Sequence, residues 1–166
     1  MENPAKVDLP PELLALKAAN DQVREAGKQS LWSALDRISA EVSRQLTQHP
    51  GGEPLQVGRQ EWQFALGTAT MVGERFGARH RGRTLLVEVG WPRLPEHGFI
   101  PNRGLARGRI GFSQNTMLQP KILAELVLRK PGDGAPQWLL LAQNAPDEPL
   151  TESRLQQFFL QLIAES

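Results

Sequence analysis

The stretch KILAELVLRKPGDGAPQWLLLAQ, Lys121 to Gln143, contains the clearest structural signal in the chain. Two apolar segments flank PGDGAP, a run of proline, glycine and aspartate that favours a turn. A short apolar run bounded by turn residues is consistent with a strand. We therefore predict a β-hairpin, with one strand in KILAELVLRK and the next in QWLLLAQ.

Three further strands are expected before this hairpin. The segments 61–72, 83–91 and 105–113 alternate apolar residues with polar or small ones, which is the period of a half-buried strand. No crossover helix separates any two of the five segments, so neighbouring strands should pair antiparallel. The sequence thus predicts a five-stranded, mostly antiparallel sheet between residues 60 and 143.

A long helix is expected at the N-terminal end, within residues 1–50. Five apolar residues recur there at helical spacing: Leu31, Leu35, Ile38, Val42 and Leu46. Asp8, before two prolines, is a plausible start, and the run from His49 to Gly52 is a stop. Gly27 lies inside the helix and costs about 1 kcal/mol relative to alanine, so either the helix breaks there or packing holds it.

The C-terminal segment, residues 150–165, predicts a second helix. Thr151 can cap it, and its buried face should consist of Leu155, Phe158, Phe159 and Leu162. Both helices should pack on one face of the sheet, so that residues 1–166 form a single α+β domain. We expect these residues in its core, with Trp62 or Trp138: Phe64, Val87, Ile110, Leu126 and Leu140.

Positive charge is concentrated in the middle of the chain. The whole sequence has 19 Lys and Arg against 18 Asp and Glu, but residues 73–110 contain eight arginines and three acidic residues. Arginine makes forked contacts with carboxylates and phosphates. The strand from Arg83 to Arg93 would span about 33 Å, so this charge forms a band that suits an extended anionic partner. The alternative is a solvated face balanced by acidic helices.

Parity along the strands places the charges on the face away from the helices. Glu88 should share that face with Arg107 and Arg109 and lie opposite one of them, as a structural ion pair. The loop from Pro92 to Gly104 is long and proline-rich, as binding loops often are. The predicted interaction surface comprises Arg81, Glu88, Arg93, Phe99, Arg103, Arg107 and Arg109.

No catalytic, cofactor or metal motif is recognisable. The chain contains no cysteine and no tyrosine, and its histidines, His49, His80 and His97, lack metal-ligand spacing. We expect each histidine to have a surface or capping role, and we expect no catalytic residue, no cofactor and no metal. The first residues lack the apolar core of a secretory signal, and no run is long enough to span a membrane. A cytoplasmic protein without membrane contact is the expectation.

These observations favour a binding or adaptor module with an unidentified protein partner. Apolar residues before Gly27, namely Leu13, Leu16 and Val23, could pair with a second copy, so we predict a homodimer. A nucleic-acid-binding domain that uses the arginine band is the first alternative. An enzyme of unknown type is the second.

Overall fold

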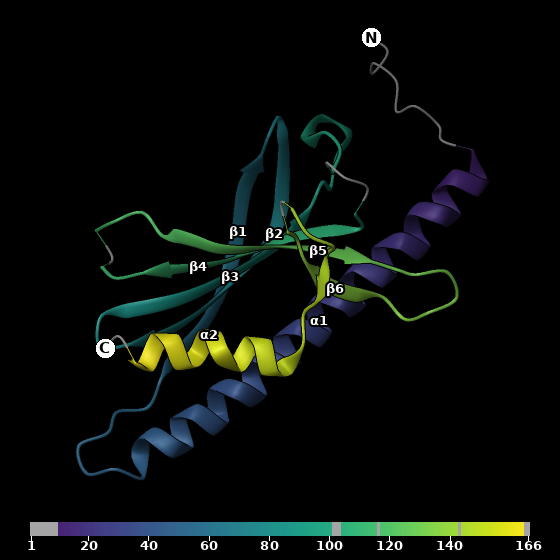
Figure 1. Cartoon of the computed structure of the whole chain (residues 1–166). Helices are drawn as coiled ribbons and strands as arrows, with labels where there is room; N and C mark the ends of the chain where they lie inside the picture. The colour runs from purple at the N-terminus through teal and green to yellow at the C-terminus, as the bar shows by residue number, and fades with distance from the viewer. Residues whose placement is uncertain (1–9, 101–103, 116, 143, 165–166) are drawn as a thin grey trace.

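The chain folds into two helices and an antiparallel sheet. The computed structural model describes residues 10–100, 104–115, 117–142 and 144–164. Helix α1 (Pro11–Thr47) precedes the sheet and helix α2 (Glu152–Ala164) follows it (Figure 1). Both pack on the same face, because the ring of Phe76 in the sheet contacts Trp32 of α1 and Phe159 of α2, at centroid distances of 6.1 and 6.5 Å. The predicted α+β class is confirmed.

The sheet has seven strands, not the predicted five, and each strand pairs antiparallel with the next one along the chain. A short 3-10 helix, η1 (Pro95–His97), follows the third strand. The strands are β1 (Gln56–Leu66), β2 (Ala69–His80), β3 (Arg83–Trp91), β4 (Ala106–Ser113), β5 (Lys121–Arg129), β6 (Gln137–Leu140) and β7 (Glu148–Pro149). The predicted antiparallel sheet is thus correct in the pairing of successive strands and wrong in its number of strands.

The miscount arises mainly from a turn inside the segment predicted as one strand, residues 61–72. Leu66 pairs with Ala69, so Gly67 and Thr68 form a two-residue hairpin loop. Gly67 has a φ of 60°, a value that glycine adopts without steric cost. The alternation expected of a strand continues through Gly67 and Thr68, so periodicity alone does not reveal the turn. The segment is the tip of the β1–β2 hairpin, and the two-residue strand β7 is the other addition.

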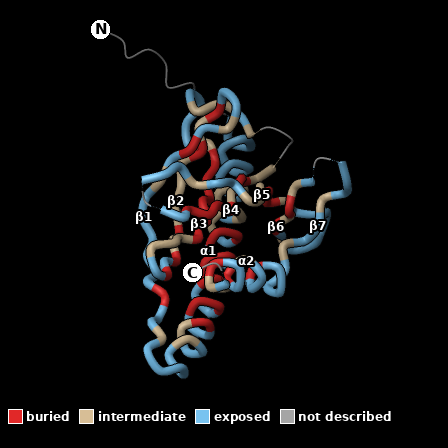
Figure 2. The backbone as a smooth tube through the Cα atoms, turned by 60° about the vertical axis from the view of Figure 1, so that its left-hand side comes forward, coloured by how far each residue is buried: buried red, intermediate tan, exposed pale blue. Residues whose placement is uncertain are grey.

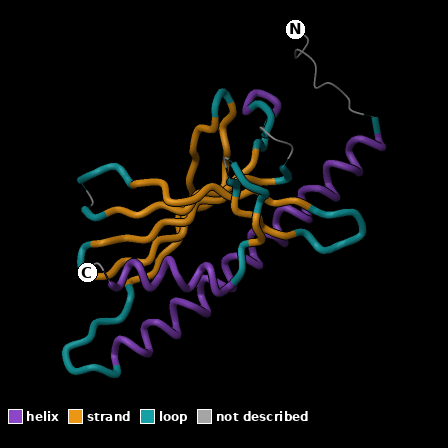
Figure 3. Tube along the Cα trace, viewed as in Figure 1, coloured by secondary structure: helices purple, strands orange, loops and turns teal. Residues whose placement is uncertain are grey.

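Helix α1 is continuous through Gly27. The added Cβ of an alanine there would lie 2.6 Å from Cδ2 of Leu128, so the missing side chain allows the helix to approach the sheet closely. Packing therefore holds the helix, which spans about 55 Å at about 1.5 Å per residue. It begins at Pro11, whereas the predicted start at Asp8 lies outside the described residues. Figure 3 shows its N-terminal turns extending beyond the sheet.

The main core lies between the helices and one face of the sheet, where the buried residues concentrate (Figure 2). The predicted core residues Val87, Ile110, Leu126, Leu140 and Trp138 are buried in it. The predicted stripe of α1 is also buried up to Val42, and Leu46 packs against this core.

Two details of the predicted core differ. Phe64 is buried in a separate cluster with Ala69 and Met71, which Trp62 and Ile100 flank. In the predicted buried face of α2, Phe158 is only half-buried, whereas Leu155, Phe159 and Leu162 are buried as predicted.

The predicted cap of α2 is present. The Thr151 hydroxyl accepts a hydrogen bond from the Arg154 backbone N–H at 3.1 Å. This bond satisfies one of the free N–H groups at the helix start and so stabilises its first turn.

The β1–β2 hairpin bends away from the plane of β3 to β5, on the side opposite α2 (Figure 1). Gly73 and Gly90 are register partners at this bend, and a Cβ on Gly73 would lie 1.9 Å from the Val89 carbonyl oxygen. The two backbones can therefore approach only because glycine occupies the crossing. The hairpin tip then covers part of the open sheet face, where Arg109 donates a hydrogen bond to the Ala65 carbonyl at 2.6 Å.

Candidate binding site

A row of small and apolar residues crosses the sheet face that the helices leave open. Its members are register partners on successive strands: Gly58, Gly77, Leu86, Gly111 and Ile122. Because three of the five are glycines, the surface along this row is low. Its backbone is exposed at Gly58 and half-buried at Gly77, whereas Gly111 is buried. We call this feature the transverse groove, since it runs across the strands.

Two polar rows border the groove. The row on one side contains Gln60, Arg75, Glu88 and Arg109, which are register partners on β1 to β4. The row on the other side contains Gln56, Arg79, Thr84 and Ser113. Three arginines and one glutamate therefore face the groove, which has a net positive charge.

The groove contains two adjoining hollows. One has a volume of 390 Å³ and lies over Gly58 and Gly77. The other has a volume of 290 Å³ and reaches Gly111 and Ile122. Arg75 and Leu86 line both, so the hollows are neighbouring parts of one depression. Their sizes fall near the lower end of the range for ligand pockets, about 300 to 1,000 Å³.

Glu88 is the buried carboxylate of the groove. It lies opposite Arg109, one of the two predicted positions, but its ion pair is with Arg75 rather than with Arg107 or Arg109, at 3.5 Å between Oε1 and Nε. Burial raises the pKa of Glu88, and this effect exceeds the opposing influence of Arg75, Arg109 and a hydrogen bond from Trp62. The buried carboxylate thus holds Arg75 in place more than it presents charge to solvent.

Aromatic rings of the hairpin tip hold Arg75 and Arg109. The guanidinium of Arg75 lies 4.1 Å from the centroid of the Trp62 ring, and that of Arg109 lies 4.9 Å from the Phe64 ring. The Nε atoms of both arginines are buried and have no hydrogen-bond partner among the described residues. Stacking and the Glu88 ion pair therefore fix these cations at one wall of the groove.

Two arginines of the predicted interaction surface, Arg107 and Arg93, make contacts within the chain. Arg107 is only 3% exposed, and its Nε donates to the Leu126 carbonyl at 3.2 Å. Its guanidinium also approaches Glu125 at 3.6 Å, and burial lowers its pKa. Arg93 lies on the Trp91 ring at 3.9 Å and donates to the Val72 carbonyl. Neither side chain faces the transverse groove.

The remaining predicted residues are dispersed. Arg81 lies in the β2–β3 turn with a φ of 51°, and Phe99 is 91% exposed in the loop after η1. Arg103 lies outside the described residues. Of the predicted interaction surface, the structure brings only Glu88 and Arg109 to the groove. The predicted band is thus divided between this groove, a turn, a loop and buried contacts.

Sequence reasoning missed the residues that complete the groove, above all Arg75, Arg79 and the glycines Gly58 and Gly77. The arginines belong to the basic segment that the sequence does show. Their shared face was hidden because the predicted strand ended at Val72, whereas β2 continues to His80. The alternation of glycine and arginine in GERFGAR, residues 73–79, was the available signal.

The histidines play different roles. His97 has the predicted capping role, since its Nδ1 accepts hydrogen bonds from the backbone N–H groups of Arg93 and Leu94, at 3.2 and 3.1 Å. His49 is exposed just after α1. His80, in contrast, is buried at the end of β2, so a surface role was the wrong expectation for it.

A larger hollow, 720 Å³ in volume, lies near the middle of α1. Its charges are mostly paired: Lys28 approaches Glu25 at 3.1 Å and Glu74 at 3.0 Å. Glu74 also accepts a hydrogen bond from Trp32 at 2.8 Å. These pairs support a structural role for its charged lining, and we do not assign it a ligand.

Neither a metal site nor a membrane span is visible in the part of the chain that the structure describes. That part contains no cluster of three or more His, Asp or Glu side chains suited to hold a metal ion. Within it, no helix is both long and apolar enough to cross a membrane. No protein-family model, curated protein or solved structure matches the chain.

Proposed function

We propose that this chain is a binding module whose transverse groove holds an acidic, extended segment of a protein partner. The observation that carries the proposal is the row of Gly58, Gly77, Leu86 and Gly111, which three arginines border. A glycine floor lets a bound chain approach the sheet backbone. The arginines supply forked donors for carboxylates, and Leu86 supplies apolar contact.

An acidic protein segment suits the groove better than a nucleic acid. Binding to single-stranded nucleic acid uses aromatic rings on which bases stack. The rings nearest the groove, Trp62 and Phe64, already stack with Arg75 and Arg109. The net charge of the whole chain is only +1, which gives little general attraction to a polyanion.

A binding role also fits the chemistry of the groove better than catalysis. Its carboxylate, Glu88, is engaged by Arg75 and by the Trp62 hydrogen bond. Ser113, at the opposite wall, donates its hydroxyl hydrogen bond to the Asn115 carbonyl at 2.8 Å. A nucleophile needs a base within hydrogen-bond reach, and these two side chains have other partners.

The proposal is tested with a labelled 12-residue peptide of alternating glutamate and leucine, by fluorescence polarisation. Arg79→Glu reverses a charge at the wall, and Gly77→Val fills the floor. A Cβ on Gly77 would lie 3.7 Å from Leu86 and Thr84, so the second change should fold normally. We expect each variant to bind the peptide about tenfold more weakly, the equivalent of about 1.4 kcal/mol.

The matched control is Lys130→Glu, which makes the same change of charge at an exposed residue after β5. Its affinity for the peptide should equal that of the wild type. Equal weakening by the control, or undiminished binding by both groove variants, would refute the proposed site. A single-stranded oligonucleotide of equal length serves as a second probe. If it binds more tightly than the peptide, with an affinity that falls linearly in log salt, the nucleic-acid alternative is correct.

A further inference from the structure

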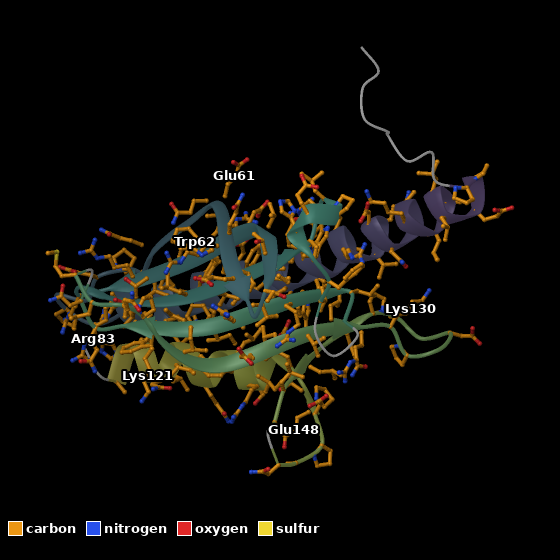
Figure 4. The ribbon with its side chains drawn as sticks, turned by 90° about the horizontal axis from the view of Figure 1, so that it is seen from above. Glu61, Trp62, Arg83, Lys121, Lys130 and Glu148 are labelled. Atoms are coloured by element: carbon orange, nitrogen blue, oxygen red, sulfur yellow. The ribbon has the colours of Figure 1, made fainter. Side chains whose placement is uncertain are left out.

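Strand β1 forms one edge of the sheet and is long for an edge strand. It has 11 residues, and positions 56–61 and 63 are exposed. Figure 4 shows Glu61 pointing outward at the rim of the molecule. Exposed edge strands present free backbone donors and acceptors that can pair with another strand. The opposite edge, β7, contains only Glu148 and Pro149 and offers no comparable surface.

The hairpin geometry determines which backbone groups of β1 are free. In a two-residue hairpin the flanking pair, here Leu66 and Ala69, exchanges hydrogen bonds. Bonding then alternates, so even-numbered residues of β1 bond to β2 and odd-numbered residues point outward. Ala65 agrees with this assignment, because its carbonyl accepts its bond from Arg109 rather than from β2. The outward groups belong to Val57, Arg59, Glu61 and Gln63.

The charges on this edge are incompletely matched within one chain. Glu61 lies directly opposite Glu74 in the β1–β2 register, and like charges at such positions are destabilising. Glu74 is held by Lys28 and Trp32, which offset burial and lower its pKa. Glu61 has no ion-pair partner among the residues of the structure that are described. Arg59, two residues before it, makes only a 3.5 Å pair with Asp36 at the surface.

We infer that β1 pairs antiparallel with β1 of a second copy of this chain, about a twofold axis at Gln60. Arg59 then lies opposite Glu61 of the partner subunit, and by symmetry each Glu61 gains a cation. Both residues have outward backbone groups, so they form a hydrogen-bonded pair, as antiparallel geometry requires. The two sheets become one continuous sheet, and the interface is isologous.

Other registers lack this match. Outward residues must face outward residues, so the twofold axis has to pass through a residue rather than between two residues. An axis at Arg59 or at Glu61 places two like charges against each other. An axis at Gly58 or at Trp62 leaves both charges opposite neutral residues. The axis at Gln60 alone pairs Arg59 with the glutamate.

The same register places Trp62 opposite Gly58 of the partner subunit, on the open face. This pair is not hydrogen-bonded, and side chains at such positions lie closest together. A Cβ added to Gly58 would have no neighbour within 4 Å, so there is space beside it for an indole ring. In such a dimer the segment of the proposed function occupies the groove over Gly77, Leu86 and Gly111. An aromatic ring that covers a cross-strand glycine stabilises a sheet edge.

This interface differs from the one predicted at the N-terminal part of α1, which stays a prediction. Leu13, Leu14 and Leu16 are exposed there, at 49%, 51% and 56%, but nothing in the structure shows what covers them. Val23 is half-buried within its own chain, so its replacement would not report on association alone.

Analytical ultracentrifugation of the full chain tests the inference by charge exchange. We expect the wild type to dimerise at tens of micromolar. Arg59→Glu and Glu61→Arg should each weaken the dimer by about tenfold, because each places two like-charge pairs at the interface. The double variant Arg59→Glu/Glu61→Arg should restore wild-type association, since the exchanged charges again face each other. Thermal melting checks that each variant folds.

Two controls distinguish pairing through β1 from a loss of the Arg59 contact within one chain and from association through α1. Asp36→Asn removes only the intrachain contact of Arg59 and should leave the dimer intact. Leu13→Glu/Leu16→Glu should also leave it intact. A monomeric wild type at about 100 µM would overturn the inference, as would failure of the double variant to associate or dissociation by the leucine variant. The groove is tested separately at Gly77 and Arg79, so either proposal can fail without the other.

Discussion

The indole Nε1 of Trp138 donates a hydrogen bond to the backbone carbonyl of Gly27 at 3.0 Å. This bond joins the middle of α1 to β6, residues that lie 111 positions apart. It occurs where the glycine lets the helix reach Leu128. A residue that weakens an isolated helix is therefore the point at which this helix contacts the sheet most closely.

We predict that Gly27→Ala destabilises the protein even though alanine is the better helix former. The gain in helix propensity is about 1 kcal/mol, whereas overpacking against buried Leu128 costs about 1 to 3 kcal/mol. Urea unfolding should show the loss. In a Leu128→Ala background the same change should become neutral or stabilising, because the clashing side chain is gone. An equal effect in both backgrounds would show that the Leu128 side chain is not the cause.

The bend of the β1–β2 hairpin should depend on Gly73 and not on Gly77. Gly73→Ala places a Cβ 1.9 Å from a backbone oxygen, so β2 and β3 must separate, and we expect a loss above about 3 kcal/mol. Gly77→Ala meets only ordinary contacts at 3.7 Å and should change the free energy of unfolding by less than about 0.5 kcal/mol. Urea titration of both variants compares them directly, and similar losses would show that the close approach is not the cause of the bend.

Arg107 and Arg79 both belong to the basic segment, residues 73–110, but their replacement by alanine should affect the stability of the protein differently. Arg107→Ala removes a buried side chain together with its hydrogen bond to the Leu126 carbonyl and its ion pair with Glu125, and should cost about 1 to 3 kcal/mol, the range for hydrogen bonds made by charged groups. Arg79→Ala, at an exposed position, should leave the melting temperature unchanged within a few degrees. If Arg107→Ala melts like the wild type, its side chain is not structural and its predicted role in binding regains support.

His80 should make stability depend on pH. Burial lowers its pKa, and repulsion from Arg81 adds to this effect against a smaller opposing influence of Glu53. The unfolded chain therefore binds a proton more readily than the folded one. The contribution of His80 is fully present above about pH 6.5 and is lost as pH falls through the lowered value. His80→Gln should flatten this slope in urea titrations between about pH 7 and pH 5, and an unchanged slope would assign the titration to other groups.

Features that depend on neighbouring residues could be predicted from the sequence. The stripe from Leu31 to Val42 is buried because helical spacing alone places those side chains on one side. Thr151 caps α2 through a contact three residues away. The position of Glu88 opposite either Arg107 or Arg109 also followed from parity and antiparallel pairing, and the register of the structure selects Arg109.

The groove could not be predicted in the same way. Gly58 and Gly77 meet only because the two-residue loop at Gly67 sets the β1–β2 register. The alternation expected of a strand continues across Gly67 and Thr68, so the sequence pattern did not indicate a turn there. The sharp bend at Gly73 and Gly90 depends on two glycines in different strands, and neither carries that information alone.

The sequence by itself determined the helices at both ends, the antiparallel pairing of successive strands and the surplus of arginine between residues 73 and 110. These are consequences of local periodicity, turn residues and composition. Only the tertiary structure decided which arginines are buried and which face the groove. The reason is that the exposure of Arg107, Arg109 and Arg75 depends on the strands and loops packed over them, and contacts between distant segments leave no periodic trace in the chain.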